Sequence, residues 1–127
     1  MNDDAWLQML IRSTDTSEVD GLKMPGFPSD AVQSQFVGSS RVNALREGAE
    51  FYKLAKAYAV QLGRPISLGA SALDFGCGWG RYLRFLWKDV AEKDLYGVDT
   101  DPDILARCRE TGVPGQLSRI TPFGKLP

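Results

Sequence analysis

The feature that most constrains the fold is a glycine-rich turn, preceded by a short apolar strand and followed further along by a second strand. Residues 72–80 read Ala-Leu-Asp-Phe-Gly-Cys-Gly-Trp-Gly, with glycine at every second position of the turn. The second strand, Leu95-Tyr-Gly-Val-Asp99, ends on a carboxylate. A glycine turn lets a ligand lie against bare main chain, and an acid at the tip of the next strand can accept hydrogen bonds from a ribose diol. The two features together predict a site for a nucleoside cofactor.

Strands and helices alternate through the second half of the chain. Apolar runs and turn residues predict three strands, at 71–75, 94–98 and 115–118. Helices are predicted between them, at 80–90 and 102–110, where Pro102 suits a first helical turn. Such alternation favours parallel pairing through right-handed crossovers. We therefore expect an α/β fold with a parallel sheet of about three strands and helices on both faces.

The first half is predicted to be helical, with one long interruption. An apolar patch indicates a short helix over 3–12, and breakers at Gly21, Pro25, Gly26 and Pro28 predict a loop over 13–38 that packs against the rest of the chain. We favour a surface connection for this loop over the alternative, a lid or flap on the substrate side. A long helix follows, because its apolar residues recur at spacings of three and four. These are Val42, Leu45, Ala49, Tyr52, Ala55, Ala59 and Leu62. We divide the chain into an extension, 1–40, and an α/β portion, 41–127.

Composition removes several classes of function. The chain has 127 residues, no histidine and a net charge of −1, so it has no Ser-His-Asp triad, no histidine zinc site and no charge-based reason to bind nucleic acid or acidic lipid. Two cysteines are too few for a structural zinc site, and we expect no metal. The N-terminal Met-Asn-Asp-Asp is acidic where a signal peptide is basic, and no run is long enough to cross a membrane. We expect a cytoplasmic protein with no membrane partner.

Three interpretations of the turn compete. In the first, the glycines make only a tight connection between strand and helix, which leaves the two strand-tip acids unexplained. In the second, the turn binds a dinucleotide through G-x-G-x-x-G, but the last position is Arg81 in one frame and Leu83 in the other. A P-loop is also absent, because no Gly-Lys-Ser/Thr follows.

The third interpretation is a resemblance. Leu73-Asp-Phe-Gly-Cys-Gly-Trp-Gly-Arg81 resembles the first motif of class I S-adenosylmethionine-dependent methyltransferases, and Tyr96-Gly-Val-Asp99 is similar to their second motif. The likeness covers roughly residues 68–120. It implies a Rossmann-like sheet, S-adenosyl-L-methionine as cofactor, and transfer of a methyl group to an acceptor that the sequence does not identify. The implied cofactor-binding residues are Asp74, Gly76, Cys77, Gly78, Gly80, Asp99 and Thr100.

Roles follow from the same resemblance. Asp74 would face the amino group of the methionine moiety, Asp99 would accept both ribose hydroxyls, and Cys77 would contribute main chain only. No catalytic base is evident. A non-catalytic module that keeps the fold is the alternative, and a dinucleotide oxidoreductase ranks third.

Two further expectations concern packing. Arg81, Arg84 and Lys88 recur at helical spacing after the turn and are predicted to form a solvated face, whereas Trp79 is predicted to lie in the core. Three strands are few for this family, so strand 71–75 is expected at an uncovered sheet edge. We therefore expect the 127 residues to be the N-terminal part of a longer methyltransferase, inactive alone, or to be completed by a second chain through that edge.

Overall fold

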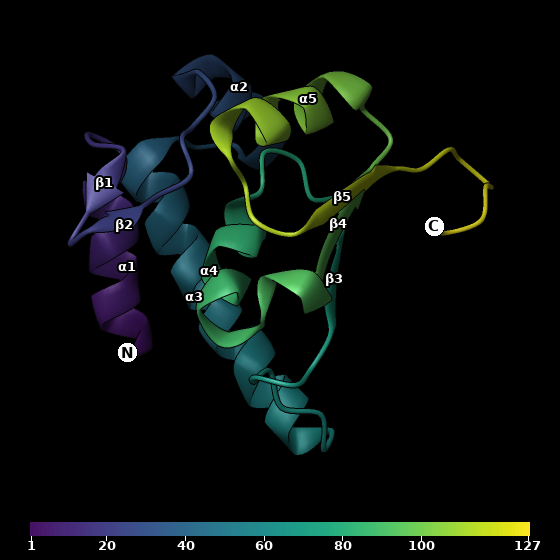
Figure 1. The fold of residues 1–127 in the computed structure, drawn as a ribbon, viewed down its shortest axis with the longest axis horizontal. Helices are drawn as coiled ribbons and strands as arrows, with labels where there is room; N and C mark the ends of the chain where they lie inside the picture. Colours follow the sequence, from purple (N-terminus) through teal and green to yellow (C-terminus); the bar gives the residue numbers. More distant parts are fainter.

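A computed structural model describes residues 1–127, and its centre is a three-stranded parallel sheet (Figure 1). The strands are β3 (Ala72–Phe75), β4 (Leu95–Asp99) and β5 (Gln116–Arg119), in the order β3-β4-β5. The register pairs Asp74 with Gly97 and Asp99 with Arg119. All three strands were predicted to within about one residue, and β3 is an edge strand as expected. The α/β fold with a Rossmann-like sheet is confirmed.

The helices that connect the strands cover one face of the sheet. α4 (Arg81–Asp89) and the short 3₁₀ helix η1 (Glu92–Asp94) join β3 to β4, and α5 (Pro102–Thr111) joins β4 to β5. Leu83 of α4 and Leu105 of α5 lie in one core cluster with Leu95. Both connections run to the next strand in the same direction along the sheet, and connections of this kind are right-handed. The two helices therefore lie on the same side of the sheet.

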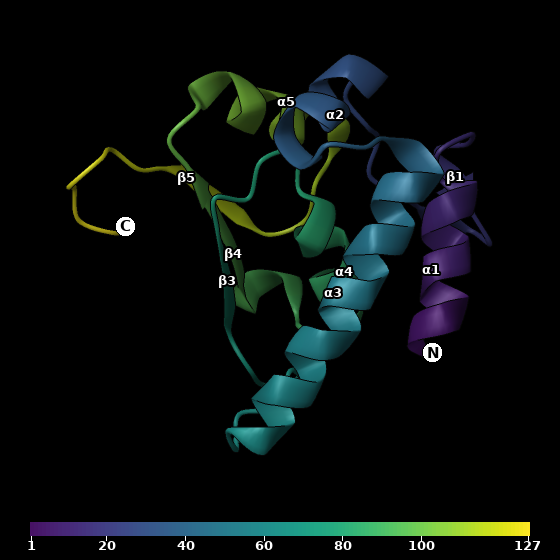
Figure 2. The same cartoon turned by 180° about the vertical axis from the view of Figure 1, so that it is seen from behind.

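The opposite face of the sheet carries no helix (Figures 1 and 2), and apart from strand residues only the C-terminal Leu126 and Pro127 border a cavity on it. Leu73, Phe75 and Tyr96 point to it and are 47%, 67% and 41% exposed. The second helical layer that we expected there is not formed by these residues. A second layer requires a crossover that steps back in the other direction, and the order β3-β4-β5 contains none.

Two N-terminal helices complete the core. α1 (Asp3–Arg12) and α3 (Arg41–Gln61) confirm the predicted helices. Trp6 and Leu10 of α1, Leu45 of α3 and Leu83 of α4 are buried in the same cluster. The distal half of α3 extends beyond the other helices (Figure 2). Leu62, predicted to lie on the buried face, is therefore 79% exposed.

The segment predicted as loop contains regular structure, which corrects the prediction for 13–38. A small antiparallel hairpin, β1 (Glu18–Val19) with β2 (Leu22–Lys23), is followed by α2 (Asp30–Val37). The same residues that suggested a loop are turn and cap residues. Gly21 has φ +81° in the hairpin turn, the Ser29 side chain accepts a hydrogen bond from the Val32 amide, and Gly38 ends α2 with φ +81°.

The predicted solvated face of α4 is wrong. Arg84 is 0% exposed, and the Arg81 and Lys88 side chains are only 13% and 10% exposed. The helical spacing was correct, but α1, α3 and the segment before α2 cover the face that it defines. A basic stripe indicates solvent only when nothing else packs over it.

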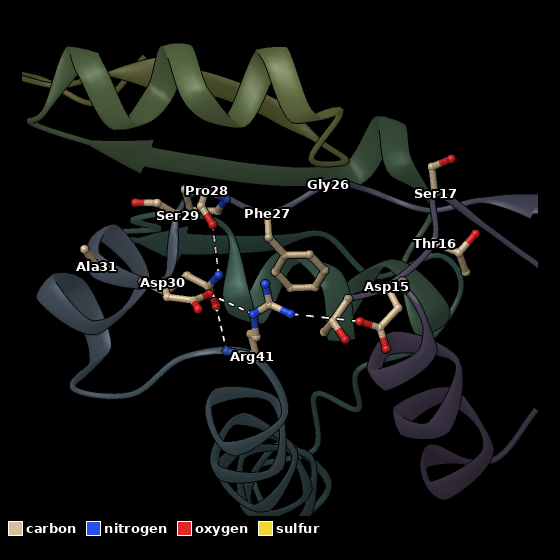
Figure 3. A pocket seen from close by; sticks show the side chains of 13 residues that line it. Asp15, Thr16, Ser17, Gly26, Phe27, Pro28, Ser29, Asp30, Ala31 and Arg41 are labelled. Carbon is tan, nitrogen blue, oxygen red and sulfur yellow. Dashed lines mark hydrogen bonds and ion pairs between the residues drawn. The ribbon is translucent and has the colours of Figure 1, made fainter.

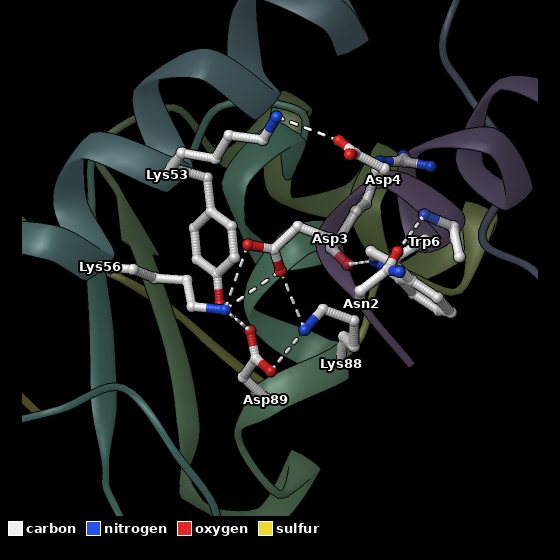
Figure 4. A network of polar contacts seen from close by, with 11 residues as sticks. Asn2, Asp3, Asp4, Trp6, Lys53, Lys56, Lys88 and Asp89 are labelled. Atoms are coloured by element: carbon white, nitrogen blue, oxygen red, sulfur yellow. Dashed lines mark hydrogen bonds and ion pairs between the residues drawn. The ribbon is translucent and has the colours of Figure 1, made fainter.

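Lys88 belongs to a polar cluster between α1, α3 and α4 (Figure 4). Its ammonium lies 3.0 Å from Asp3 and 2.6 Å from Asp89, and Lys56 bridges the same two carboxylates at 3.0 and 3.1 Å. The Tyr52 hydroxyl donates to Asp89 at 2.6 Å. Asp89 therefore contacts α3 directly, and Lys56 and Lys88 link it to Asp3 of α1, so that the cluster ties three helices together.

No helix in the structure combines the length and the apolar character that crossing a membrane requires.

Candidate cofactor site

The glycine turn lies at the carboxyl edge of the sheet and is anchored to the neighbouring strand. The amides of Gly76 and Cys77 both donate to the Val98 carbonyl, at 2.8 and 2.9 Å. Gly76, Gly78 and Gly80 have φ of +76°, +53° and +85°, which is the left-handed region that favours glycine. The turn therefore depends on glycine for its backbone shape at all three positions.

The three glycines differ in their surroundings. A Cβ atom at Gly76 would have no heavy atom within 4 Å, so main chain is open to a ligand there. At Gly78 it would lie 3.2 Å from Cδ1 of Phe36 in α2, and at Gly80 it would lie 2.6 Å from Val113. Gly76 is the position that offers close approach to a ligand, while Gly80 allows the start of α4 to pack against Val113.

Asp99 is bound directly to the turn. Its Oδ2 accepts a hydrogen bond from the Gly78 amide at 2.9 Å, and its Oδ1 accepts one from the Asp101 amide at 2.9 Å. Each carboxylate oxygen has a further lone pair. The predicted ribose acceptor therefore also fixes the turn, and it keeps acceptor capacity on both oxygens.

Asp74 lies at the end of β3, on the same sheet face as Gly97 and Asp99. Its Oδ2 is buried and has no hydrogen-bond partner. Burial, together with the charge of Asp99, raises the pKa of Asp74 to about 6, and the charge of Arg81 opposes that rise. An unpartnered buried carboxylate oxygen is costly unless a donor reaches it. Asp74 is thus a buried acceptor without a donor, two residues before Gly76.

The other predicted cofactor residues lie in the same region with different exposure. Cys77 is buried, its sulfur would lie 3.2 Å from a Cβ at Gly97, and burial raises the pKa of its thiol. Thr100 is exposed beside Asp101, whose side chain caps α5. Cys108 donates from its buried thiol to the Gly78 carbonyl at 3.2 Å. The structure brings Asp74, Gly76, Gly78 and Asp99 together around the turn, with Thr100 at its rim.

Arg81 is a site-forming residue that sequence reasoning missed. It donates to the Ala44 carbonyl at 3.2 Å and to the Tyr82 hydroxyl at 3.0 Å, and it lies 3.7 Å from Glu47. It links the turn to α3 and partly compensates the charge of Asp74. The one signal in the sequence was its position directly after Gly80.

Two cavities border residues near the turn, although none of Gly76, Gly78 and Gly80 lines a cavity. A cavity of about 190 Å³ borders Asp74 together with Phe51 and Tyr82, and one of about 250 Å³ borders Phe36 and Asp101. A polar cavity of about 650 Å³ lies farther off, behind Phe27, where Figure 3 shows Arg41 between Asp15 and Asp30. None of the predicted cofactor residues lines that cavity. No group of three or more acidic or cysteine side chains gathers to hold a metal ion.

The comparison with known families agrees with this geometry. Residues 72–122, from the first residue of β3 to just beyond β5, match a family model described as a methyltransferase domain. This match supports the resemblance to class I methyltransferases that the same residues carry in the sequence. The match contains both strand-tip acids and the whole glycine turn. No solved structure matches the chain.

Proposed function

We propose that this methyltransferase domain binds S-adenosyl-L-methionine at the glycine turn and serves the transfer of its methyl group to an acceptor. The observation that carries the proposal is the bond from the Gly78 amide to Asp99, because it joins the turn and the ribose-type acceptor into one rigid unit. In this arrangement both elements of a nucleoside site are preorganised before any ligand binds.

The residues present fit this cofactor. The unpartnered Oδ2 of Asp74 would receive the cationic amino group of the methionine moiety, a charge-assisted pairing that also relieves its own desolvation. The open main chain at Gly76 would lie along the cofactor, and Asp99 would accept the ribose hydroxyls. The cofactor carries no phosphate, which agrees with a turn lacking the pyrophosphate fingerprint.

The chemistry supplied by the bound cofactor is an activated methyl group on a sulfonium. The protein's part in such a displacement is alignment and exclusion of water. Asp99 and Asp74 would hold the two ends of the cofactor, and the anchored turn would fix its position along the sheet edge. We assign no residue as a base, and the acceptor is unidentified.

Two other functions compete with this proposal. A dinucleotide oxidoreductase is disfavoured because Arg81 stands where the third glycine would be, with its side chain packed against Gly48 of α3. A non-catalytic module would keep the same turn and bind the same cofactor without transferring the methyl group. A binding measurement distinguishes the proposal from the oxidoreductase, and a transfer assay distinguishes it from the non-catalytic module.

The first test is calorimetric titration with S-adenosylhomocysteine and, separately, with NADH. We expect the first ligand to bind and the second not to, and tighter binding of NADH would overturn the proposal. The second test is labelled-methyl transfer from the cofactor to a cell lysate. Binding without transfer by the chain or by any longer protein that contains it would favour the non-catalytic module.

A further inference from the structure

Residues 25–37, here called the strap, run from the hairpin across the start of α4 to the glycine turn. Figures 1 and 2 both show α2, the end of the strap, beside α5. The Gly26 amide donates to the Thr111 carbonyl at 2.7 Å, and the Gln33 side chain donates to the Pro28 carbonyl at 2.9 Å. Gln33 also accepts from the Arg41 amide at 2.8 Å and is 1% exposed. The strap is therefore fixed by backbone and buried side-chain hydrogen bonds.

Arg84 is the main connection between the strap and α4. Its guanidinium donates to the carbonyls of Pro25 and Gly26 at 3.2 and 2.6 Å, and to the Trp79 carbonyl inside the glycine turn at 3.5 Å. It also lies over the rings of Phe27 and Trp79, at 4.1 and 5.1 Å from their centroids. One side chain thus holds the strap and the turn in a fixed relation.

This connection is energetically costly. Arg84 has no carboxylate within ion-pair distance, its Nε has no hydrogen-bond partner, and burial lowers its pKa. A buried charge without an acid is held only by carbonyls and aromatic faces, which compensate its desolvation in part. An apolar residue would fill the same space at lower cost. The arrangement suggests a role beyond packing.

The strap places one aromatic ring against the turn. Phe36 of α2 lies so close to Gly78 that a Cβ there would be 3.2 Å from its ring. Gly78 is the residue whose amide bonds to Asp99. Phe36 is 37% exposed, so part of its surface rests on the turn and part remains free. The free part borders the cavity of about 250 Å³ that Asp101 also lines.

We propose that Phe36 is a wall of the cofactor pocket, contributed by the N-terminal segment, and that Arg84 is the positioning residue that holds it there. The proposal rests on the proposed function, because the ligand is the same nucleoside cofactor. It adds a binding residue that lies outside the matched methyltransferase segment. Phe36 packs on Gly78, whose amide bonds to the ribose-binding carboxylate of Asp99, and an aromatic ring in that region suits a nucleoside, which presents a flat base next to its sugar.

The first experiment titrates the full chain with S-adenosylhomocysteine, using Phe36→Ala and the control Tyr58→Ala. Tyr58 is a 55% exposed aromatic on the distal half of α3. We expect about tenfold weaker binding for Phe36→Ala and no change for Tyr58→Ala. Normal binding by Phe36→Ala would overturn this inference and leave the proposed function standing. No binding by the unsubstituted chain would overturn both.

The second experiment separates positioning by Arg84 from a merely structural role. Amide hydrogen exchange of residues 25–37 should be faster in Arg84→Lys, which retains the charge but cannot reach all three carbonyls. Arg84→Lys should also weaken binding of S-adenosylhomocysteine, but add little further loss in the Phe36→Ala background. Additive losses, or unchanged exchange in the strap, would show that Arg84 does not act through Phe36.

Discussion

The Gly78 amide donates to the Asp99 carboxylate over 2.9 Å, across a separation of 21 residues. Asp99 ends β4, whereas Gly78 lies in the turn that follows β3, and the parallel pairing of the two strands brings them to the same edge. A single carboxylate thereby stabilises the loop that it would help to make into a binding site. Stability and binding are coupled at this position.

Replacing Asp99 should therefore weaken both properties. In Asp99→Asn one of the two backbone donors, Gly78 or Asp101, faces the NH₂ group instead of an oxygen, and the charge that strengthens the ribose bonds is lost. We expect S-adenosylhomocysteine to bind about ten- to 100-fold more weakly, together with a lower Tm. Asp94→Asn, just before the opposite end of β4, is the control and should bind normally. Unchanged affinity in Asp99→Asn, measured by calorimetry, would contradict the assignment.

Asp74 should make the free protein less stable at neutral pH than at mildly acidic pH. Burial holds its pKa at about 6, above the ordinary 3.8, so the folded chain retains the proton more tightly than the unfolded chain. The contribution of Asp74 to the free energy of unfolding is thus greatest below pH 4 and is lost as the pH rises from about 4 to about 6. Asp74→Asn should remove that loss.

We expect Asp74→Asn to be about 2–3 kcal/mol more stable than the unsubstituted chain at pH 7.5, and nearly equal to it below about pH 4. The same substitution should weaken binding of S-adenosylhomocysteine, since the amino group loses its carboxylate. Urea unfolding at several pH values measures the first effect, and calorimetry measures the second. A variant that is less stable at both ends of the pH range would show that Asp74 has a partner in the fold.

Local patterns predicted what depends on neighbours in the sequence. The turn at Gly76 to Gly80 and the strand that ends on Asp99 could be located because glycine spacing and apolar runs express local backbone requirements. The proximity of Asp99 to the turn was predicted too, because parallel strands meet at one edge, but the hydrogen bond from the Gly78 amide was not.

Other features depend on partners far away in the chain. Arg84 reaches carbonyls 58 and 59 residues earlier, and no periodicity encodes that contact. The eight residues of α2 were not predicted to be helical, because they lie between Pro28 and Gly38. Proline and glycine indicate a loop unless they are recognised as residues that border a helix. The carbonyls that accept from the buried Arg84 can be identified only from the three-dimensional structure. The same is true of the caps that start and end α2.

The polar cluster around Asp89 should account for part of the acid sensitivity of the fold. Burial acts to raise the pKa of Asp89, but the hydrogen bonds from Lys88, Tyr52 and Lys56 outweigh it, so the pKa of this carboxyl is lowered overall. The pKa of Asp3 is lowered in the same way by Lys88 and Lys56. Their contribution to stability is therefore present above about pH 4 and lost as the pH falls below that value.

Asp89→Asn should lower the free energy of unfolding by about 1–3 kcal/mol at pH 7, because two lysines and a tyrosine lose a charged acceptor. The difference from the unsubstituted chain should shrink at pH 3. Asp4→Asn is the matched control: its pair with Lys53 is solvent-exposed, with side chains 80% and 44% exposed, and its loss should be within experimental error. Equal effects of the two substitutions in urea unfolding would show that the cluster is no more than a set of surface ion pairs.

The sheet face that no helix covers predicts self-association. β3 leaves one row of backbone hydrogen-bonding groups unpaired at the sheet edge, and Leu73, Phe75 and Tyr96 expose apolar surface beside it. Unpaired edges of this kind pair with other strands. We expect the purified chain to associate as its concentration rises in sedimentation velocity, and Leu73→Lys to reduce that association strongly. Leu68→Lys, at a 79% exposed leucine in the loop before β3, is the control and should not reduce it. A chain that stays monomeric and unfolds cooperatively at every concentration would show that three strands protect their own edge.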